Sequence, residues 1–202
     1  IRAHFRTPKS YFLGSSVMYN VMENNGLMKW SDQKYKPEEQ IRAEYPALVK
    51  DFRAAKFPEE IVEQLRELIE IAKDRPLIVR SSSLLEDNFG ASFAGKYESY
   101  FCPNQGNVEE NLAYLTDAIA QVYASALRAE PIIYRQQTAL IDYDERIAVL
   151  IQFVEGEKFG DYFLPHGAGV AFSRNLYRWS ADIKREDGFL RLVWGMGTRA
   201  VD

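Results

Sequence analysis

The sequence has 202 residues, of which 47% are hydrophobic and 27% charged, so it is long enough to bury a sizeable core. Its formal net charge is −4, with 25 basic and 29 acidic residues and no dominant basic stripe, so we expect no nucleic acid partner. No apolar run approaches the roughly 20 residues that span a bilayer, so we expect no membrane partner either. The single cysteine, Cys102, excludes an intrachain disulfide and favours a reducing, cytoplasmic compartment.

Hydrophobic periodicity and turn residues predict the elements of the chain. Ser15 or Ser16 is the expected cap of the first helix, Pro46 is expected to interrupt a helical segment, and Asn107 is expected to cap the longest helix. In chain order, the predicted elements are a strand in 1–14, a helix over 15–26, helical segments in 37–55, a helix over 58–73, strands over 77–80 and 97–101, a helix over 107–128, and strands over 146–156, 162–175 and 188–197. This order indicates the α/β (α+β) class, with a helix-rich lobe at about 1–140 and a strand-rich lobe at about 141–202.

The segment after the predicted strand at 77–80 is dense in hydrogen-bond donors. Arg80 ends the strand, and Ser81 and two more serines follow it. A guanidinium fork, hydroxyls and backbone N–H groups suit a polyphosphate, and the glycines and alanines at 90–95 would let the backbone approach it closely. The alternative is a solvated turn in which Arg80 pairs with Glu86 or Asp87, and composition alone favours this alternative because serine-rich turns are common.

A second candidate site lies in the apolar run at 146–156. A buried strand that passes through Gln152 and Val154 could present backbone N–H and C=O groups to the edge of an adenine ring, with Glu155 or Glu157 free for ribose hydroxyls. The alternative is a core strand with a polar end. The residues taken alone favour the core strand.

Three further features of the sequence could carry chemistry. Ser173–Asn175 end a predicted strand, where they are either a second anion contact or a surface turn. Lys96 either contacts a phosphate or is solvated, and we favour the solvated state. His4 and His166 are far apart in the sequence and near no cysteine, so we expect neither a metal site nor a Cys–His pair in this chain.

Taken together, these segments resemble one protein family. The stretch IVRSSSLLEDNFGASFAGKYESY is similar to the Val-Arg-Ser-Ser…Glu-Asp…Ser-Phe-Ala-Gly signature of the nucleotide-binding domain of phosphoenolpyruvate synthase and pyruvate phosphate dikinase. The stretches IAVLIQFV and AGVAFSRN resemble two strands of that domain, WGMGTRAV its glycine-rich turn, and TPKSYFLGSSVMYNVMENNGL its early strand and helix. The resemblance covers most of the chain in the family's order, and it favours the phosphate-loop interpretation of residues 80–95.

The resemblance implies an ATP-grasp-like, two-lobed nucleotide-binding domain, of which residues 1–202 would be the central part. It implies ATP as ligand, Mg²⁺ as cofactor, and phosphoryl transfer from ATP to a histidine on another domain and then to pyruvate. Arg80 is then a phosphate contact and the candidate catalytic residue. The other nucleotide-binding candidates are Ser81, Glu86, Asp87, Ser92 and Gly95, which match the signature, and Gln152, Val154 and Glu155, which belong to the adenine and ribose hypothesis.

Parts of the family pattern are expected outside this chain. The phosphate-contacting lysine would precede residue 1, the magnesium ligands would follow residue 202, and the phosphorylated histidine would lie on another domain. We therefore expect a fragment of a cytoplasmic phosphotransferase that is inactive alone, whose partners are ATP and, through other domains, pyruvate; a homo-oligomer is compatible with this expectation. The alternatives are a relative that phosphorylates a glucan or an antibiotic, and a non-catalytic nucleotide-sensing module.

Overall fold

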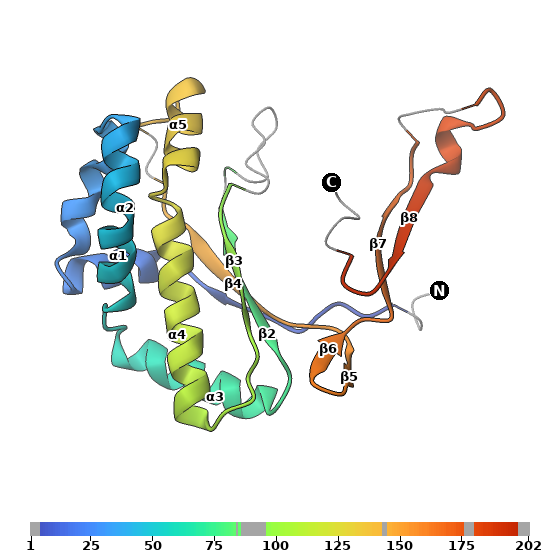
Figure 1. The fold of residues 1–202 in the computed structure, drawn as a ribbon, viewed down its shortest axis with the longest axis horizontal. Helices are drawn as coiled ribbons and strands as arrows, with labels where there is room; N and C mark the ends of the chain where they lie inside the picture. Colours follow the sequence, from blue (N-terminus) through green and yellow to red (C-terminus); the bar gives the residue numbers. More distant parts are fainter. Residues whose placement is uncertain (1–4, 84, 86–95, 143–144, 176–179, 198–202) are drawn as a thin grey trace. The chain divides into compact units, whose positions relative to one another are not determined.

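The computed structural model divides the chain into two compact units, residues 1–154 and residues 155–202. It describes residues 5–83, 85, 96–142, 145–175 and 180–197, and every structural statement below concerns these residues. Both helices and strands are present, which confirms the predicted α+β class (Figure 1).

The first unit contains one sheet and a layer of helices. Its strands are β1 (Ser10–Leu13), β2 (Leu77–Ser82), β3 (Ser99–Cys102) and β4 (Ala148–Phe153), and its helices are α1 (Ser15–Asn24), the 3-10 helix η2 (Leu27–Tyr35), α2 (Glu38–Arg53), α3 (Glu59–Ala72), α4 (Val108–Ser125) and α5 (Ala129–Gln137). The four strands pair in the order β1-β4-β2-β3, and all neighbours are antiparallel. Figure 1 shows the helices gathered on one side of this sheet.

The core lies between the sheet and α4. Side chains alternate between the two faces of a strand, so Leu77 and Val79 of β2 and Ile151 of β4 point to the same face. Leu77 and Val79 are fully buried there and belong to one hydrophobic cluster with the α4 residues Leu115 and Ile119. The apolar positions of α4 repeat at helical spacing, so the face that the sequence pattern predicts is the face that packs on the sheet.

The N-terminus of α4 has the cap that the sequence predicts. The Asn107 side chain accepts a hydrogen bond from the Glu110 backbone N–H at 2.9 Å, and the Glu110 carboxylate accepts one from the Asn107 N–H at 2.9 Å. This reciprocal capping box satisfies two N–H groups that a helix end leaves unpaired. By contrast, the cap predicted for α1 at Ser15 or Ser16 is wrong, because the helix begins at Ser15 and Gly14 is its N-cap.

The predicted interruption at Pro46 is also wrong. Helix α2 runs from Glu38 to Arg53 with Pro46 inside it. A proline inside a helix removes one backbone hydrogen bond at a cost of about 3 kcal/mol. Ile41, Leu48 and Phe52 of the same helix are fully buried, and their packing outweighs that local cost. Tertiary contacts therefore decide the length of this helix.

An ion-pair network joins α2 to the start of α5. Glu130 accepts hydrogen bonds from Arg128 Nε at 2.6 Å and from Arg42 Nη1 at 2.7 Å. These two contacts, the one from Arg128 first, lower the pKa of Glu130 from 4.5 to about 2. The contribution of Glu130 to the free energy of unfolding is then present above about pH 4.5 and is lost as the pH falls toward 2.

We therefore expect Glu130→Gln to lower the free energy of unfolding at pH 6 by about 1 kcal/mol. The expected effect is small because the Glu130 side chain is 35% exposed and its charge is screened by solvent. The difference from the wild type should shrink as the pH falls below 4, and urea unfolding at a series of pH values measures it. Glu39→Gln, at an exposed position of α2, is the matched control and should change little at any pH. A Glu130→Gln deficit that does not vary with pH would contradict the ion-pair account.

The second unit consists of two hairpins. β5 (Glu157–Phe159) pairs with β6 (Tyr162–Leu164), and β7 (Gly167–Phe172) pairs with β8 (Phe189–Trp194), which follows the short 3-10 helix η3 (Arg185–Asp187). The single strand predicted over 162–175 is therefore two strands, and β5 was not predicted. Among the described residues of this unit no apolar side chain is buried, and Trp194 is 91% exposed.

Candidate functional site: an arginine on the uncovered sheet face

The sheet of the first unit has one face that the described helices do not cover. Strand pairing places two rows of side chains across this uncovered face. One row runs Phe12, Leu150, Arg80, Ser99 and the other runs Ser10, Gln152, Ile78, Phe101, in the strand order β1-β4-β2-β3. Phe12 and Phe101 are 69% and 58% exposed, which is unusual for large aromatic side chains. The face thus combines accessible aromatic rings with a central cation.

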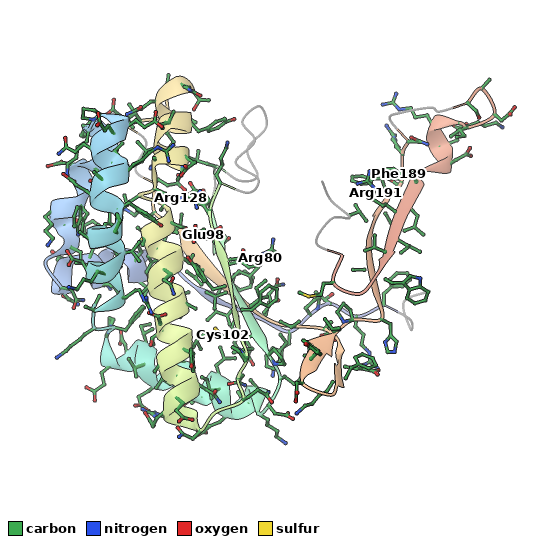
Figure 2. The ribbon with its side chains drawn as sticks, viewed as in Figure 1. Arg80, Glu98, Cys102, Arg128, Phe189 and Arg191 are labelled. Atoms are coloured by element: carbon green, nitrogen blue, oxygen red, sulfur yellow. The ribbon has the colours of Figure 1, made fainter. Side chains whose placement is uncertain are left out.

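Arg80 is the only cation of these two rows and projects from β2 away from α4 (Figure 2). It is exposed, and within the described part of the chain its guanidinium has no hydrogen-bond or ion-pair partner. β2 is an inner strand, paired on both sides by β3 and β4, so the backbone that carries Arg80 is held rigidly. An unpaired guanidinium on such an inner strand can form two parallel hydrogen bonds to a phosphate or carboxylate.

The residues after Arg80 in the signature are divided between the two faces. Ser81 lies on the helix-covered face, opposite the buried Val149, and is half-buried. Ser82, one of the three serines predicted to offer hydroxyls, lies on the same face as Arg80 and is exposed. The period-two alternation of a strand could have distinguished it from Ser81. Glu86, Asp87, Ser92 and Gly95, and with them the alternative pairing of Arg80, lie outside the described residues.

The adenine-edge candidates occupy the end of β4. Gln152 points to the uncovered face, where its Nε2 donates to Ser10 Oγ at 3.0 Å. The Val154 N–H donates to the Pro76 carbonyl at 2.9 Å, and the Val154 carbonyl accepts from Arg75 Nη2 at 3.5 Å. The described conformation thus offers a ligand the Gln152 side chain rather than the Val154 backbone. Glu155 is exposed at the start of the second unit, and a role for these residues in adenine binding stays a prediction.

Glu145 joins the two ends of the segment between β2 and β3. Its Oε1 accepts hydrogen bonds from the hydroxyl of Ser83, just after β2, and from the hydroxyl of Tyr97, just before β3, at 3.2 Å for the tyrosine. The Leu85 N–H donates to Ser83 Oγ at 2.9 Å, and Leu85 is buried. Burial and the nearby Glu145 charge raise the pKa of Tyr97. Sequence reasoning missed Glu145 because a lone acid before a strand carries no local signal.

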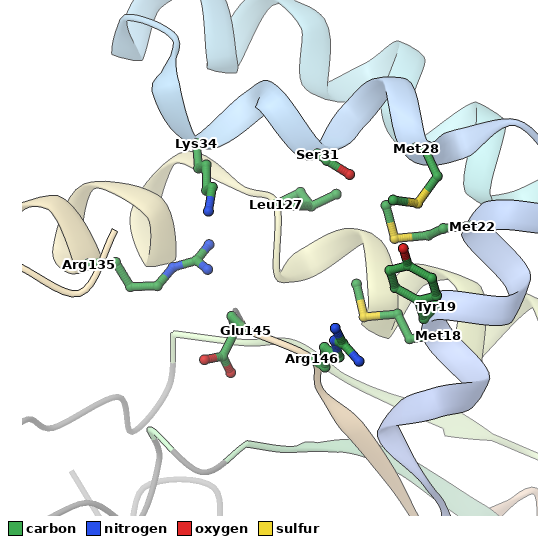
Figure 3. A pocket seen from close by; sticks show the side chains of 10 residues that line it. All are labelled: Met18, Tyr19, Met22, Met28, Ser31, Lys34, Leu127, Arg135, Glu145 and Arg146. Atoms are coloured by element: carbon green, nitrogen blue, oxygen red, sulfur yellow. The ribbon is translucent and has the colours of Figure 1, made fainter. Parts of the chain in front are cut away.

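A pocket of about 320 Å³ lies among the helices of the first unit (Figure 3). Its lining mixes methionines with charged groups and consists of Met18, Tyr19, Met22, Met28, Ser31, Lys34, Leu127, Arg135, Glu145 and Arg146. These residues come from α1, η2, α5 and the segments next to α4 and β4. No sequence motif indicated this pocket, because its charged residues are spread over more than a hundred positions.

The described residues show no site for a metal ion. They contain no group of three or more His, Cys, Asp or Glu side chains that could hold one. Cys102 is buried, which raises the pKa of its thiol to about 11, and His166 lies 3.8 Å from the exposed Glu157. Among the described helices, none is long and apolar enough to cross a membrane.

The predicted second anion contact lies just after β7. Arg174 is exposed there, and the Asn175 N–H donates to the Arg185 carbonyl at 2.8 Å. A role for these residues in anion binding stays a prediction.

Comparison with known proteins agrees with the resemblance in the sequence. No curated protein matches the chain. One family model, described as pyruvate phosphate dikinase, AMP/ATP-binding domain, matches residues 1–202, which is the whole chain. The family is a nucleotide-binding domain of kinase- and dikinase-type enzymes. This chain belongs to the family of AMP/ATP-binding domains of pyruvate phosphate dikinase.

Proposed function

We propose that the chain binds MgATP on the uncovered face of the first unit's sheet, with Arg80 on the polyphosphate. The observation that carries the proposal is the exposed guanidinium of Arg80, which has no partner among the described residues and is held on an inner strand. The family match indicates that the ligand is a nucleotide. The planar guanidinium of Arg80 can form two parallel hydrogen bonds to phosphate oxygens.

Each neighbouring side chain has a role in this proposal. Ser82 lies on the same face and can add a hydroxyl to the phosphate contacts, while Phe12 and Phe101 offer ring surfaces. Gln152 can bond a polar edge of the base or ribose, since its amide has more hydrogen-bonding capacity than its single bond to Ser10 uses. Glu86, Asp87, Ser92 and Gly95 remain candidates for the loop that approaches the phosphates, and Glu155 for the ribose.

Within a longer enzyme, the reaction would be phosphoryl transfer from ATP to a histidine on another domain and then to pyruvate. Such transfer depends on positioning the nucleotide and neutralising phosphate charge, and Mg²⁺ would supply part of that neutralisation. The described residues offer no carboxylate cluster for Mg²⁺, so in this proposal the metal arrives with the nucleotide and its protein ligands lie elsewhere. The contribution of this chain would be to hold and orient ATP in an ATP-grasp-like domain.

Titration calorimetry on the full-length protein tests the proposal. MgATP should bind to one saturable site with a dissociation constant between about 1 μM and 1 mM, the range in which most enzymes meet their substrates. Pyruvate should not be needed for this binding. The proposal is overturned if MgATP, at a concentration of about five times the upper limit of that range, gives neither a heat of binding nor a rise in the melting temperature of the protein.

A further inference from the structure

The pocket among the helices is not used by the proposed ATP site. Arg80 points to the uncovered face of the sheet, whereas the pocket is lined by residues of α1, η2 and α5, which lie in the helix layer. Three of its ten lining residues are cationic, Lys34, Arg135 and Arg146, and only Glu145 is acidic. Figure 3 shows the side chains of Lys34 and Arg135 pointing toward one another into the pocket.

Arg135 is a charged group that the fold buries almost completely. It is 3% exposed, and its guanidinium donates to the carbonyls of Ala126 at 3.0 Å and Pro131 at 3.4 Å. These acceptors are neutral, and among the described residues no carboxylate forms an ion pair with Arg135. Burial lowers the pKa of Arg135, and the nearby Tyr97 and Glu145 oppose this only in part. A buried cation without a paired anion lowers the stability of the fold unless a bound anion supplies the opposite charge.

Lys34 adds a second unpaired cation to the same pocket. It is half-buried, its Nζ lies 5.0 Å from the centre of the Tyr35 ring, and within the described ranges it makes no ion pair. The lining carboxylate, Glu145, accepts hydrogen bonds from Ser83 and Tyr97 through Oε1, while its buried Oε2 has no hydrogen-bond partner among the described residues. Two cations that converge on one cavity repel each other, so an anion between them would relieve that repulsion.

The opposite wall of the pocket is apolar. Met18 and Met22 of α1 are buried, and Met28 of η2 and Leu127 complete the wall. Methionine side chains are flexible and polarizable, which lets such a wall adapt to aromatic and aliphatic bodies of different shape. The volume of about 320 Å³ is at the small end of the range for ligand pockets.

We propose that this pocket binds a small organic anion, with a carboxylate or phosphate head group held by Lys34 and Arg135 and a compact apolar body against the methionine wall. Arg146, whose guanidinium lies over the Tyr19 ring at 5.0 Å from its centre, also lines the pocket. None of the residues that would hold this anion is one of those proposed to bind ATP, so its test does not depend on the proposed function.

Calorimetry on the full-length protein with four probes tests the chemistry of the site. Benzoate and benzamide have nearly the same shape and differ in charge, while phenyl phosphate and inorganic phosphate differ in the apolar body. Benzoate or phenyl phosphate should bind with a dissociation constant of about 1 mM or tighter, and benzamide and inorganic phosphate at least about tenfold more weakly. Whichever of benzoate and phenyl phosphate binds more tightly identifies the preferred head group.

Three variants on the same 3-10 helix locate the binding. Lys34→Gln removes a pocket cation and should weaken the preferred anion about tenfold. Lys29→Gln removes a cation that pairs with Asp51 at 2.8 Å outside the pocket, and it should leave binding unchanged. Met28→Gln should weaken the anion with an apolar body more than inorganic phosphate. Arg135 is left unchanged because its loss would also leave the Ala126 and Pro131 carbonyls without their donor.

The outcomes separate this site from the ATP site. Binding of the anion should be the same in the presence of saturating MgATP and in Arg80→Ala. Binding that MgATP abolishes would assign the probe to the nucleotide site and overturn the proposal. Equal binding of benzamide and the preferred anion, no binding of either anion up to about 10 mM, or an unchanged affinity in Lys34→Gln would also overturn it.

Discussion

Arg80→Ala in the full-length protein should weaken MgATP binding, or slow phosphoryl transfer, by roughly tenfold to a hundredfold. A hydrogen bond to a charged group is worth about 1.5–3 kcal/mol, and 1.4 kcal/mol corresponds to a factor of ten. Arg80→Lys should restore only part of the affinity, because an ammonium group cannot reproduce the bidentate fork. Calorimetry with MgATP measures both effects.

Thermal unfolding of the same Arg80→Ala variant without nucleotide provides the decisive comparison. Because Arg80 is exposed and has no partner among the described residues, the melting temperature should change little. Arg66→Ala, which removes a surface arginine paired with Glu109, is the matched control and should leave ATP binding unchanged. A loss of stability with unchanged ATP affinity would instead favour the pairing of Arg80 with Glu86 or Asp87.

Val79→Asp, one residue away on the same strand, should abolish folding. Val79 is fully buried on the helix-covered face, opposite Ile151 and Tyr100. An ionised carboxylate there would lie among apolar side chains without a partner, at a cost of several kcal/mol against a typical total stability of about 5–15 kcal/mol. We expect insoluble protein, or soluble protein without a cooperative thermal transition, as measured by circular dichroism during heating.

Two further substitutions on β2 show whether burial of the charge is the cause of the expected loss of folding in Val79→Asp. Val79→Ala should fold but lose roughly 2 kcal/mol in urea unfolding, because it leaves a cavity without introducing a charge. Ser82→Asp places the same carboxylate at an exposed position of the uncovered face and should keep the fold. A normal melting transition for Val79→Asp would show that the face assignment of β2 is wrong.

The elements with strong local signals were predicted from the sequence. Helix α4 was predicted because Asn107 caps it and its apolar residues recur at helical spacing, and both signals are confined to neighbouring residues. Helix α2 was misjudged at Pro46 because burial of Leu48 and Phe52 depends on other elements. The 3-10 helix η2 was not predicted for the same reason. Its buried Gln33 donates a hydrogen bond from Nε2 to the Ile41 carbonyl at 3.3 Å, and no local sequence pattern indicates this contact.

The candidate site was predicted in part. Arg80 was identified because an arginine at the end of an apolar strand is visible in the sequence itself. The rows of the uncovered face depend on which strands pair, and β1 pairs with β4 across more than a hundred residues. The same holds for Lys34, Arg135 and Glu145, which three separate segments bring to one pocket. Convergence of this kind depends on the tertiary fold, and a single sequence does not reveal it.

The exposed side chains of the β7–β8 hairpin bear on how the protein behaves at high concentration. Leu190, Leu192 and Trp194 alternate along β8 and so project from one face, where they are 61%, 69% and 91% exposed. A two-stranded ribbon with such a face can recruit other chains through its apolar side chains and its unpaired strand edges. The colloidal solubility of the chain would then be governed by residues 189–194, while its melting temperature reflects the core of the first unit. Preparations that are stable to heat can therefore still precipitate on concentration.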